Sequence, residues 1–412
     1  MVNTKNLMPR LFAKTGFSLY SGLNSSIYLL FAVRIINRFG DFVQLLLVLI
    51  LTGKLGMDSH EAGFFISLTL VATMVGQLTA GVIADKLARK QVLVFCQMMV
   101  SVCYLVCAFL MGSQYASLVP LIILVGSPFR GATAPVTNAM VADFSDDKDR
   151  GRAFSLLYLG TNIGVAVGPV AAAFLYGYSI PLLFGGSSLL LLFSTVLLLA
   201  KLPLVKVEVY SDASQKIPGG FLLSLLRNKV LMLFLLFFAL YHLTYQQNTF
   251  ALPLQFSHLF GDGLGAKRFG LLMTVNALTV LVTTPIITKI TASWGQLKNM
   301  ALAMLFYVVG YGAYAFCLHL PVFLVATFIW TLGEILMATN ANVFLNAYAP
   351  PRYRTRFNAL SHIAGGLGSA LAPTLGGLLL LGRSFSFLWV LMALICLALA
   401  VMYLGLDRHL QG

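Results

Sequence analysis

Twelve long apolar segments, separated by mostly short polar connections, dominate this chain of 412 residues. Only 10% of its residues are charged, whereas a soluble domain carries about 25%. Each segment is long enough to cross a bilayer as a helix, which needs roughly 20 residues. We therefore predict an all-α membrane protein with twelve transmembrane helices over residues 26–51, 63–84, 92–112, 117–143, 153–175, 179–200, 230–258, 269–288, 300–318, 321–348, 357–382 and 385–406.

The one long connection, residues 201–229, divides these helices into two sets of six. It carries five lysine and arginine residues and the sequence Pro218-Gly219-Gly220, which breaks regular structure. This pattern predicts an N-terminal six-helix bundle over 1–200, a basic linker over 201–229, and a C-terminal six-helix bundle over 230–412.

The positions of the cationic residues predict the orientation. With both termini in the cytoplasm, twenty of the 27 lysine and arginine residues lie on the cytoplasmic side and four on the outer side. Anionic lipid headgroups at the cytoplasmic face then account for the net charge of +14, without any nucleic-acid partner. We expect a monomeric, multi-pass protein of the bacterial cytoplasmic (inner) membrane.

The first predicted span carries three charged residues, Arg34, Arg38 and Asp41, spaced so that one helical face holds them all. Charge at bilayer depth is costly, so this face must point into the bundle. Arg38 and Asp41 could form a structural ion pair that only offsets its own burial. Alternatively, all three line a central cavity, with Asp41 as a proton or substrate-cation site. Arg130, in the fourth span, also needs an anionic partner, and Asp41 is a candidate.

The C-terminal half is rich in uncharged polar groups. The seventh span holds His242, Tyr245, Gln246, Gln247 and Asn248, and exposing so many polar groups to lipid would be costly, so we expect some to line a cavity. His242 could instead be a hydrogen-bonded interior residue.

Glu334 is the only acidic residue within a predicted C-terminal span. Desolvation disfavours an ionised carboxyl, which suits a group that must bind and release a proton. The alternative is a neutral acid, hydrogen-bonded for packing. Asn340 lies one to two helical turns further along and is a further candidate for the cavity.

The connection between the second and third spans carries a motif made of Gly81, Asp85, Lys86, Arg89 and Lys90. It resembles the corresponding loop of major facilitator superfamily transporters. The resemblance implies two pseudo-symmetric six-helix bundles built from inverted repeats, with a site between them that opens alternately to either side. It also implies a cytoplasmic gate, in which Arg89 pairs with Asp143 and Asp85 faces the N-terminus of the eleventh helix.

The fifth span contains Gly160, Gly164 and Gly168-Pro169, and this spacing provides a flat face for close helix packing. The motif is similar to one found in drug/proton antiporters of the superfamily. The resemblance implies a proton-coupled antiporter that exports amphiphilic small molecules, as in multidrug efflux, with Asp41, Glu334 and Arg130 in proton coupling. The proton gradient would be the driving force, without a cofactor. The sequence contains no phosphate loop, nucleophile elbow or metal-ligand pair, and therefore predicts neither an ATPase nor an enzyme.

Two alternatives stay open. Arg34-x-x-Asn37-Arg38-Phe39 and the stretch 157–164, which includes Asn162, a further candidate for the substrate cavity, resemble proton-dependent oligopeptide transporters. That resemblance implies proton-coupled transport of di- and tripeptides. A non-transporting membrane sensor on the same scaffold is a more remote alternative.

Overall fold

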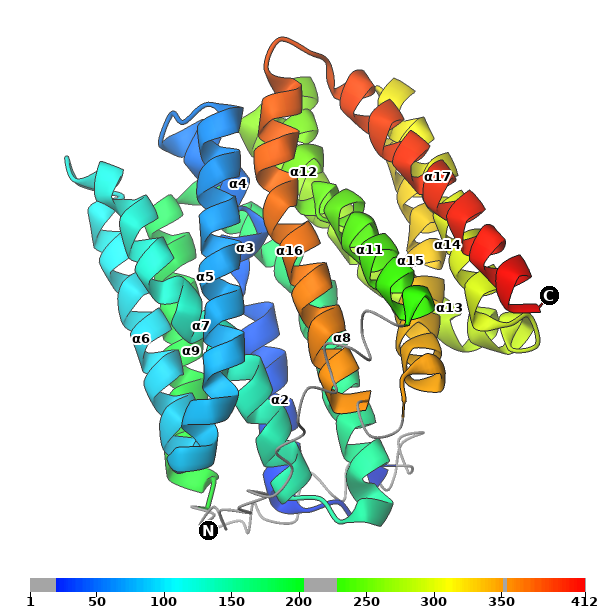
Figure 1. The fold of residues 1–412 in the computed structure, drawn as a ribbon. Coiled ribbons are helices and arrows are strands. Elements are labelled where there is room, and N and C mark those ends of the chain that lie inside the picture. Colours follow the sequence, from blue (N-terminus) through cyan, green and yellow to red (C-terminus); the bar gives the residue numbers. More distant parts are fainter. Residues whose placement is uncertain (1–19, 204–227, 351–353, 412) are drawn as a thin grey trace. The chain divides into compact units, whose positions relative to one another are not determined.

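The computed structural model describes residues 20–203, 228–350 and 354–411, apart from the side chains at 81, 82, 85, 86, 147, 354, 355 and 411. The regular structure in these ranges is helical throughout (Figure 1). The principal helices are α2 (Ser25–Phe39), α3 (Phe42–Leu45), α4 (Leu47–Leu49), α5 (Ser59–Lys86), α6 (Arg89–Leu110), α7 (Val119–Asp143), α8 (Asp147–Tyr178), α9 (Ile180–Lys201), α11 (Lys229–Tyr245), α12 (Gln247–Phe260), α13 (Asp262–Thr291), α14 (Gln296–Phe316), α15 (Leu320–Tyr348), α16 (Arg354–Leu380) and α17 (Phe385–Gln411).

Eleven helical segments among the described residues are long and apolar enough to cross a membrane. They correspond to predicted spans two to twelve. The sixth of the eleven, which corresponds to the seventh predicted span, joins α11 and α12 over Lys229–Phe260. Large apolar side chains such as Phe109 and Phe316 are exposed on the outside of these helices. Helices that are apolar on nearly every face suit a lipid surrounding.

The prediction of one continuous helix over 26–51 is wrong. The chain there forms α2, α3, α4 and a π-helical turn over Ile50–Lys54. Helix α2 ends at Phe39, and the backbone N–H of Gly40 closes its last turn by donating to the carbonyl of Ile36. Glycine and aspartate are poor helix formers, so Gly40-Asp41 is a favourable place for a break. Asp41 consequently follows the helix instead of lying on its face.

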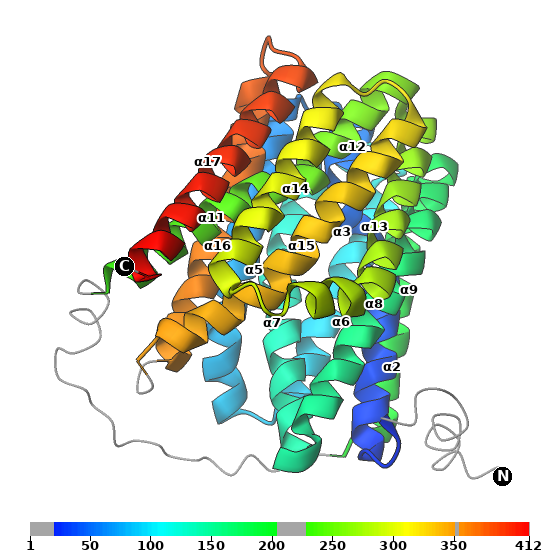
Figure 2. The same ribbon diagram turned by 90° about the vertical axis from the view of Figure 1, so that its right-hand side faces the viewer.

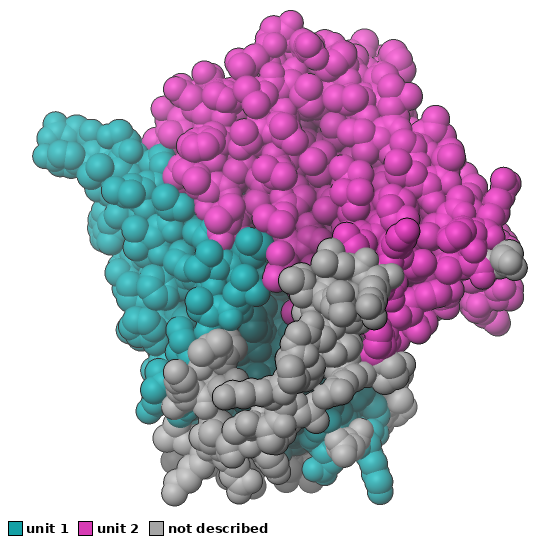
Figure 3. Space-filling view, viewed as in Figure 1, with its two compact units in different colours: residues 1–45, 72–210 teal, residues 46–71, 211–412 magenta. Residues whose placement is uncertain are grey.

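Clustering of the contacts divides the chain into two compact units (Figure 3). Unit 1 comprises residues 1–45 and 72–210, and unit 2 comprises residues 46–71 and 211–412. Residues 46–71, which we placed in the N-terminal bundle, thus have most of their contacts in unit 2. The predicted bundle boundaries and the cytoplasmic position of both termini stay predictions, and most of the linker 201–229 lies outside the described residues.

Each unit has its own packed helices. In unit 1, α6 packs against α7 and α9, while α2 packs against α8. In unit 2, α14 packs against both α15 and α17, which Figure 2 shows at the front of the molecule. The core of unit 2 is rich in aromatic residues, since Tyr307, Tyr311, Tyr314, Trp330 and Trp389 are all fully buried.

Candidate functional site

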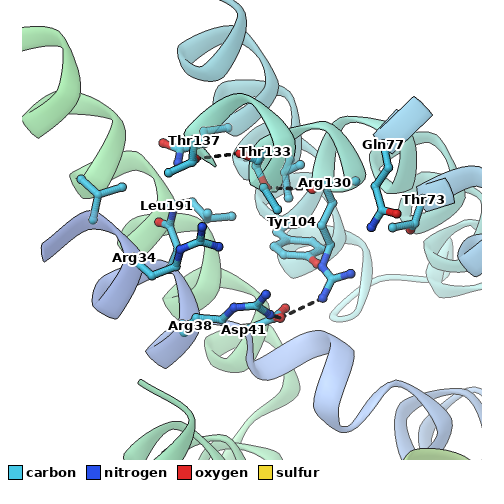
Figure 4. Close-up of a pocket in the computed structure, with 17 residues that line it drawn as sticks. Arg34, Arg38, Asp41, Thr73, Gln77, Tyr104, Arg130, Thr133, Thr137 and Leu191 are labelled. Atoms are coloured by element: carbon cyan, nitrogen blue, oxygen red, sulfur yellow. Dashed lines mark hydrogen bonds and ion pairs between the residues drawn. The ribbon is translucent and has the colours of Figure 1, made fainter. Parts of the chain in front are cut away.

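A polar cavity of about 150 Å³ lies within unit 1 (Figure 4). Four charged residues line it: Arg34 and Arg38 from α2, Asp41 from the break after α2, and Arg130 from α7. Uncharged polar side chains complete the wall, namely Asn37, Thr73, Gln77, Gln97, Tyr104, Thr133 and Thr137. The charged residues of the first span therefore face the protein interior, although the helix that we expected to align them is broken.

Asp41 contacts two of the three arginines. A guanidinium nitrogen of Arg130 lies 2.8 Å from Oδ2 of Asp41 and donates a hydrogen bond to it. Arg38 is further away, with 3.7 Å between its Nη1 and the same carboxylate oxygen. Arg130, for which the sequence predicts an anionic partner, is thus the closer partner of Asp41, and Arg38 is the more distant one.

Arg34 contacts no carboxylate in the part of the chain that the structure describes. Its Nη2 donates a hydrogen bond of 3.0 Å to Oδ1 of Asn138 on α7. Its Nε is buried, and no hydrogen-bond acceptor among the described residues reaches it. Asn138 is neutral, so the positive charge of Arg34 is not compensated by this contact.

The glycines of the fifth span position α2, the helix that carries Arg34 and Arg38. A Cβ atom added to Gly164 on α8 would lie 2.6 Å from Cβ of Arg38 and 2.9 Å from the carbonyl oxygen of Ile35. A Cβ atom added to Gly160 would lie 2.8 Å from a ring carbon of Phe31. One added to Gly168 would lie 2.9 Å from the carbonyl oxygen of Phe39. Pro169 follows within the same helix. The two helices therefore touch backbone to backbone beside the cavity.

Replacing Gly164 with alanine should destabilise the protein, because the added methyl group meets backbone that cannot move aside cheaply. Overpacking of this kind costs about 1–3 kcal/mol. Thermal unfolding of the detergent-purified protein measures the loss. Gly185→Ala on α9 is a matched control, because a Cβ there meets nothing within 4 Å. Equal melting temperatures for the two variants would contradict this account of the glycine face.

A second polar cluster surrounds Glu334 on α15, within unit 2. The hydroxyl of Tyr245 on α11 donates to Oε1 of Glu334 at 2.7 Å, and Nδ2 of Asn276 on α13 donates to Oε2 at 2.7 Å. Asn276 also contacts the hydroxyl of Thr331 at 2.9 Å. Both carboxylate oxygens thus accept a hydrogen bond from the protein. We did not predict Asn276, because one amide in an apolar span is equally typical of packing.

Aromatic side chains pack around this cluster. The ring of Tyr245 meets that of Trp330 edge to face, with 6.3 Å between the centroids. His242 packs edge to face against Phe238 and Tyr241, and its Nδ1 is 3.5 Å from the hydroxyl of Ser369. The His242 ring therefore has the interior, aromatic surroundings of our alternative interpretation.

The other polar residues predicted for a cavity lie apart from these clusters. Asn248 is buried and donates to the hydroxyl of Tyr311, whereas Gln246, in the break between α11 and α12, donates to Thr249. Asn340 accepts a hydrogen bond from Asn299 in a second polar pocket, of about 220 Å³, lined by residues of α13, α14 and α15. Asn162 donates to the carbonyl of Tyr158 within its own helix.

The gate motif is partly described. Arg89 forms an ion pair with Asp143, and its Nη1 also donates to the carbonyl of Ala139 at 3.4 Å. Lys90 donates from Nζ to the carbonyls of Leu199 and Leu202 near the end of α9. Gly81 and Asp85 belong to α5, but the predicted contact of the Asp85 side chain lies outside what the structure describes. No group of three or more metal-ligating side chains occurs among the described residues.

The chain belongs to the Major Facilitator Superfamily, whose family model matches residues 30–361 and again 247–412. It is thus a multi-pass membrane transporter. It is 24% identical over 345 residues to an uncharacterized MFS-type transporter, YqjV of Bacillus subtilis, covering 81% of this chain and 80% of the relative. It is 22% identical to a Na(+), Li(+), K(+)/H(+) antiporter of Planococcus maritimus, covering 76% of this chain and 80% of the relative.

A solved structure with the same fold is that of the nucleoside transporter NupG. The TM-score is 0.77 at 15% identity, and the match covers 93% of this chain and 99% of NupG. At this identity the similarity concerns the fold alone.

Proposed function

We propose that the protein is a proton-coupled antiporter that exports amphiphilic small molecules by alternating access, driven by the proton gradient without a cofactor. The observation that carries the proposal is that each unit holds a partly buried acidic residue that accepts a hydrogen bond from another side chain of the same unit. Asp41 contacts Arg130, and Glu334 contacts Tyr245 and Asn276. Acids so placed are typical of proton pathways in transporters.

Antiport requires that the proton and the substrate oppose each other's binding. The surroundings of Glu334 suit this requirement, because Tyr245 and Asn276 donate to its ionised form. A substrate whose own hydrogen-bond donors reach Glu334 would stabilise that ionised form further and displace the proton. We therefore assign the exchanged proton to Glu334. Asp41 and Arg130 form an ion pair, and we propose that this ion pair breaks when the proton and the substrate bind or leave.

Two further points support the proposal. The similarity to an antiporter that exchanges cations for protons favours exchange over uniport. The Arg89–Asp143 pair fits a latch on the cytoplasmic side, which opens and closes during the transport cycle. We place the protein as a monomer in a bacterial cytoplasmic membrane, with anionic lipid at its cytoplasmic face.

Everted membrane vesicles test the proposal. We expect that adding a substrate to vesicles with a preformed acid interior dissipates the pH difference, as a pH-sensitive dye reports, and that vesicles without the protein do not respond. Proton-driven accumulation of a dipeptide by whole cells would instead establish the peptide importer. The absence of any proton-linked signal from a panel of dyes, antibiotics and dipeptides would overturn both and favour the sensor.

A further inference from the structure

The cavity of unit 1 has an excess of positive charge. Three arginines line it, Arg34, Arg38 and Arg130, and Asp41 is its only lining acid in the part of the chain that the structure describes. Arg130 takes the shorter contact with Asp41, at 2.8 Å. Two positive charges of the wall, those of Arg34 and Arg38, are therefore left without a carboxylate at hydrogen-bond distance.

The geometry of these two arginines suits a ligand. They lie one turn apart on α2, so their side chains lie on the same side of that helix. Figure 4 shows both side chains directed toward the space that also faces Asp41 and Arg130. A guanidinium binds a carboxylate or phosphate with two parallel hydrogen bonds, and no acceptor among the described residues reaches the buried Nε of Arg34.

The remaining wall indicates the size and nature of the ligand. Pockets that enclose drug-sized molecules measure roughly 300–1,000 Å³. At about 150 Å³, this cavity holds a charged group and a few further atoms. Tyr104 offers an aromatic surface and Val33, Val100 and Leu191 offer apolar ones, while Gln77 and Thr137 offer further hydrogen bonds.

We infer that Arg34 and Arg38 bind the anionic group, a carboxylate or a phosphate, of a small organic substrate. As a statement about the transported compound, this inference rests on the proposed function. It makes the exported amphiphiles anions and not cations, because a cation would be repelled by the net positive charge of three arginines and one aspartate in the cavity wall.

The inference also constrains coupling. A proton on Asp41 removes the negative charge that repels an anion in the cavity, and a bound anion in turn favours the protonated form of Asp41. Anion and proton would therefore favour each other's binding. That combination favours cotransport, so the proton exchanged for the substrate must be carried elsewhere. Glu334 in unit 2 is the acid assigned to that exchange above.

Calorimetric titration of the purified full chain in detergent, without any gradient, tests the inference. The probes are benzoate, phenyl phosphate, benzyl alcohol and benzylammonium, which share one ring and differ in charge. We expect benzoate or phenyl phosphate to bind at least tenfold more tightly than the alcohol or the ammonium ion, and the tighter anion identifies the preferred headgroup. Equal affinities for the anions and the alcohol would overturn the inference.

Variants locate the site. Arg34→Gln and Arg38→Gln should each weaken anion binding at least tenfold. Arg34→Lys keeps the positive charge but loses the paired donors of the guanidinium, so its affinity for the anion should lie between those of the wild type and Arg34→Gln. Arg383→Gln removes an exposed arginine that lies over the ring of Phe387, outside the cavity, and this variant should bind the anion like the wild type. A well-folded Arg34→Gln protein with undiminished anion binding would overturn the assignment.

The two proposals fail separately. Anion binding that depends on Arg34 but gives no proton-linked exchange in vesicles would contradict the antiporter and keep this site. Proton-linked exchange of neutral or cationic compounds without anion binding would contradict this site and keep the antiporter.

Discussion

Replacing Glu334 with glutamine should abolish proton-driven exchange, while the variant still binds substrate, more weakly than the wild type. Glutamine cannot bind and release a proton, but its carbonyl can still accept a hydrogen bond from Tyr245 or Asn276. We expect exchange in everted vesicles to fall at least about 100-fold, which corresponds to about 2.7 kcal/mol. Substrate affinity, measured by calorimetry, should fall less than about tenfold, or about 1.4 kcal/mol, because glutamine resembles the protonated acid, which opposes substrate binding.

Glu61→Gln is the matched control for this experiment. Glu61 is exposed in the first turn of α5, and within the described ranges its carboxylate accepts a hydrogen bond only from the backbone N–H of Asp58. That variant should exchange at the wild-type rate. Full active transport by Glu334→Gln would remove Glu334 from the proton-carrying role.

Replacing Asp41 with asparagine should tighten anion binding and slow transport. The substitution removes the only carboxylate that lines the cavity among the described residues, and it leaves Arg130 and Arg38 uncompensated. We expect benzoate to bind at least about fivefold more tightly, which corresponds to about 1 kcal/mol. The turnover of exchange should fall about fivefold, or about 1 kcal/mol, because a tightly held substrate is released slowly.

A double variant separates this charge effect from a loss of structure. Adding Arg130→Gln to Asp41→Asn removes the surplus positive charge and should bring the benzoate affinity back toward that of the wild type. Asp149→Asn, which removes an acid at the start of α8 outside the cavity, is the control for the loss of one carboxylate. An affinity for benzoate that falls in Asp41→Asn would show that the carboxylate itself helps to bind the substrate.

The sequence predicts most of the helices because lipid demands long apolar helices. Residues 321–348 and 385–406 were predicted as spans, and the structure has α15 over Leu320–Tyr348 and α17 over Phe385–Gln411. The break in the first span was missed for a physical reason. The spacing of residues shows only whether they could share a helical face. Asp41 lies after the end of the helix, and its closest partner, Arg130, is 89 positions away along the chain, so the sequence spacing does not reveal their contact.

The candidate site is predictable in its charges but not in its hydrogen bonds. Arg34, Arg38, Asp41 and Arg130 are rare residue types in apolar segments, so each is conspicuous in the sequence. Asn276 and Gln97 are uncharged, and the sequence does not say which amide reaches a carboxylate. Which arginine of the cavity is neutralised by Asp41 decides the class of ligand, and it depends on the distances between these side chains, which only the structure supplies.

All three tryptophans of the chain, Trp294, Trp330 and Trp389, lie in unit 2. Trp330 is fully buried and packs against Tyr245, the residue that donates to Glu334, whereas unit 1 contains no indole group. The native protein consequently carries an intrinsic optical reporter of the surroundings of Glu334. Its ultraviolet emission should respond to events around that acid without any attached dye, and an anion that enters the arginine-lined cavity should change the emission only if its effect reaches the other unit.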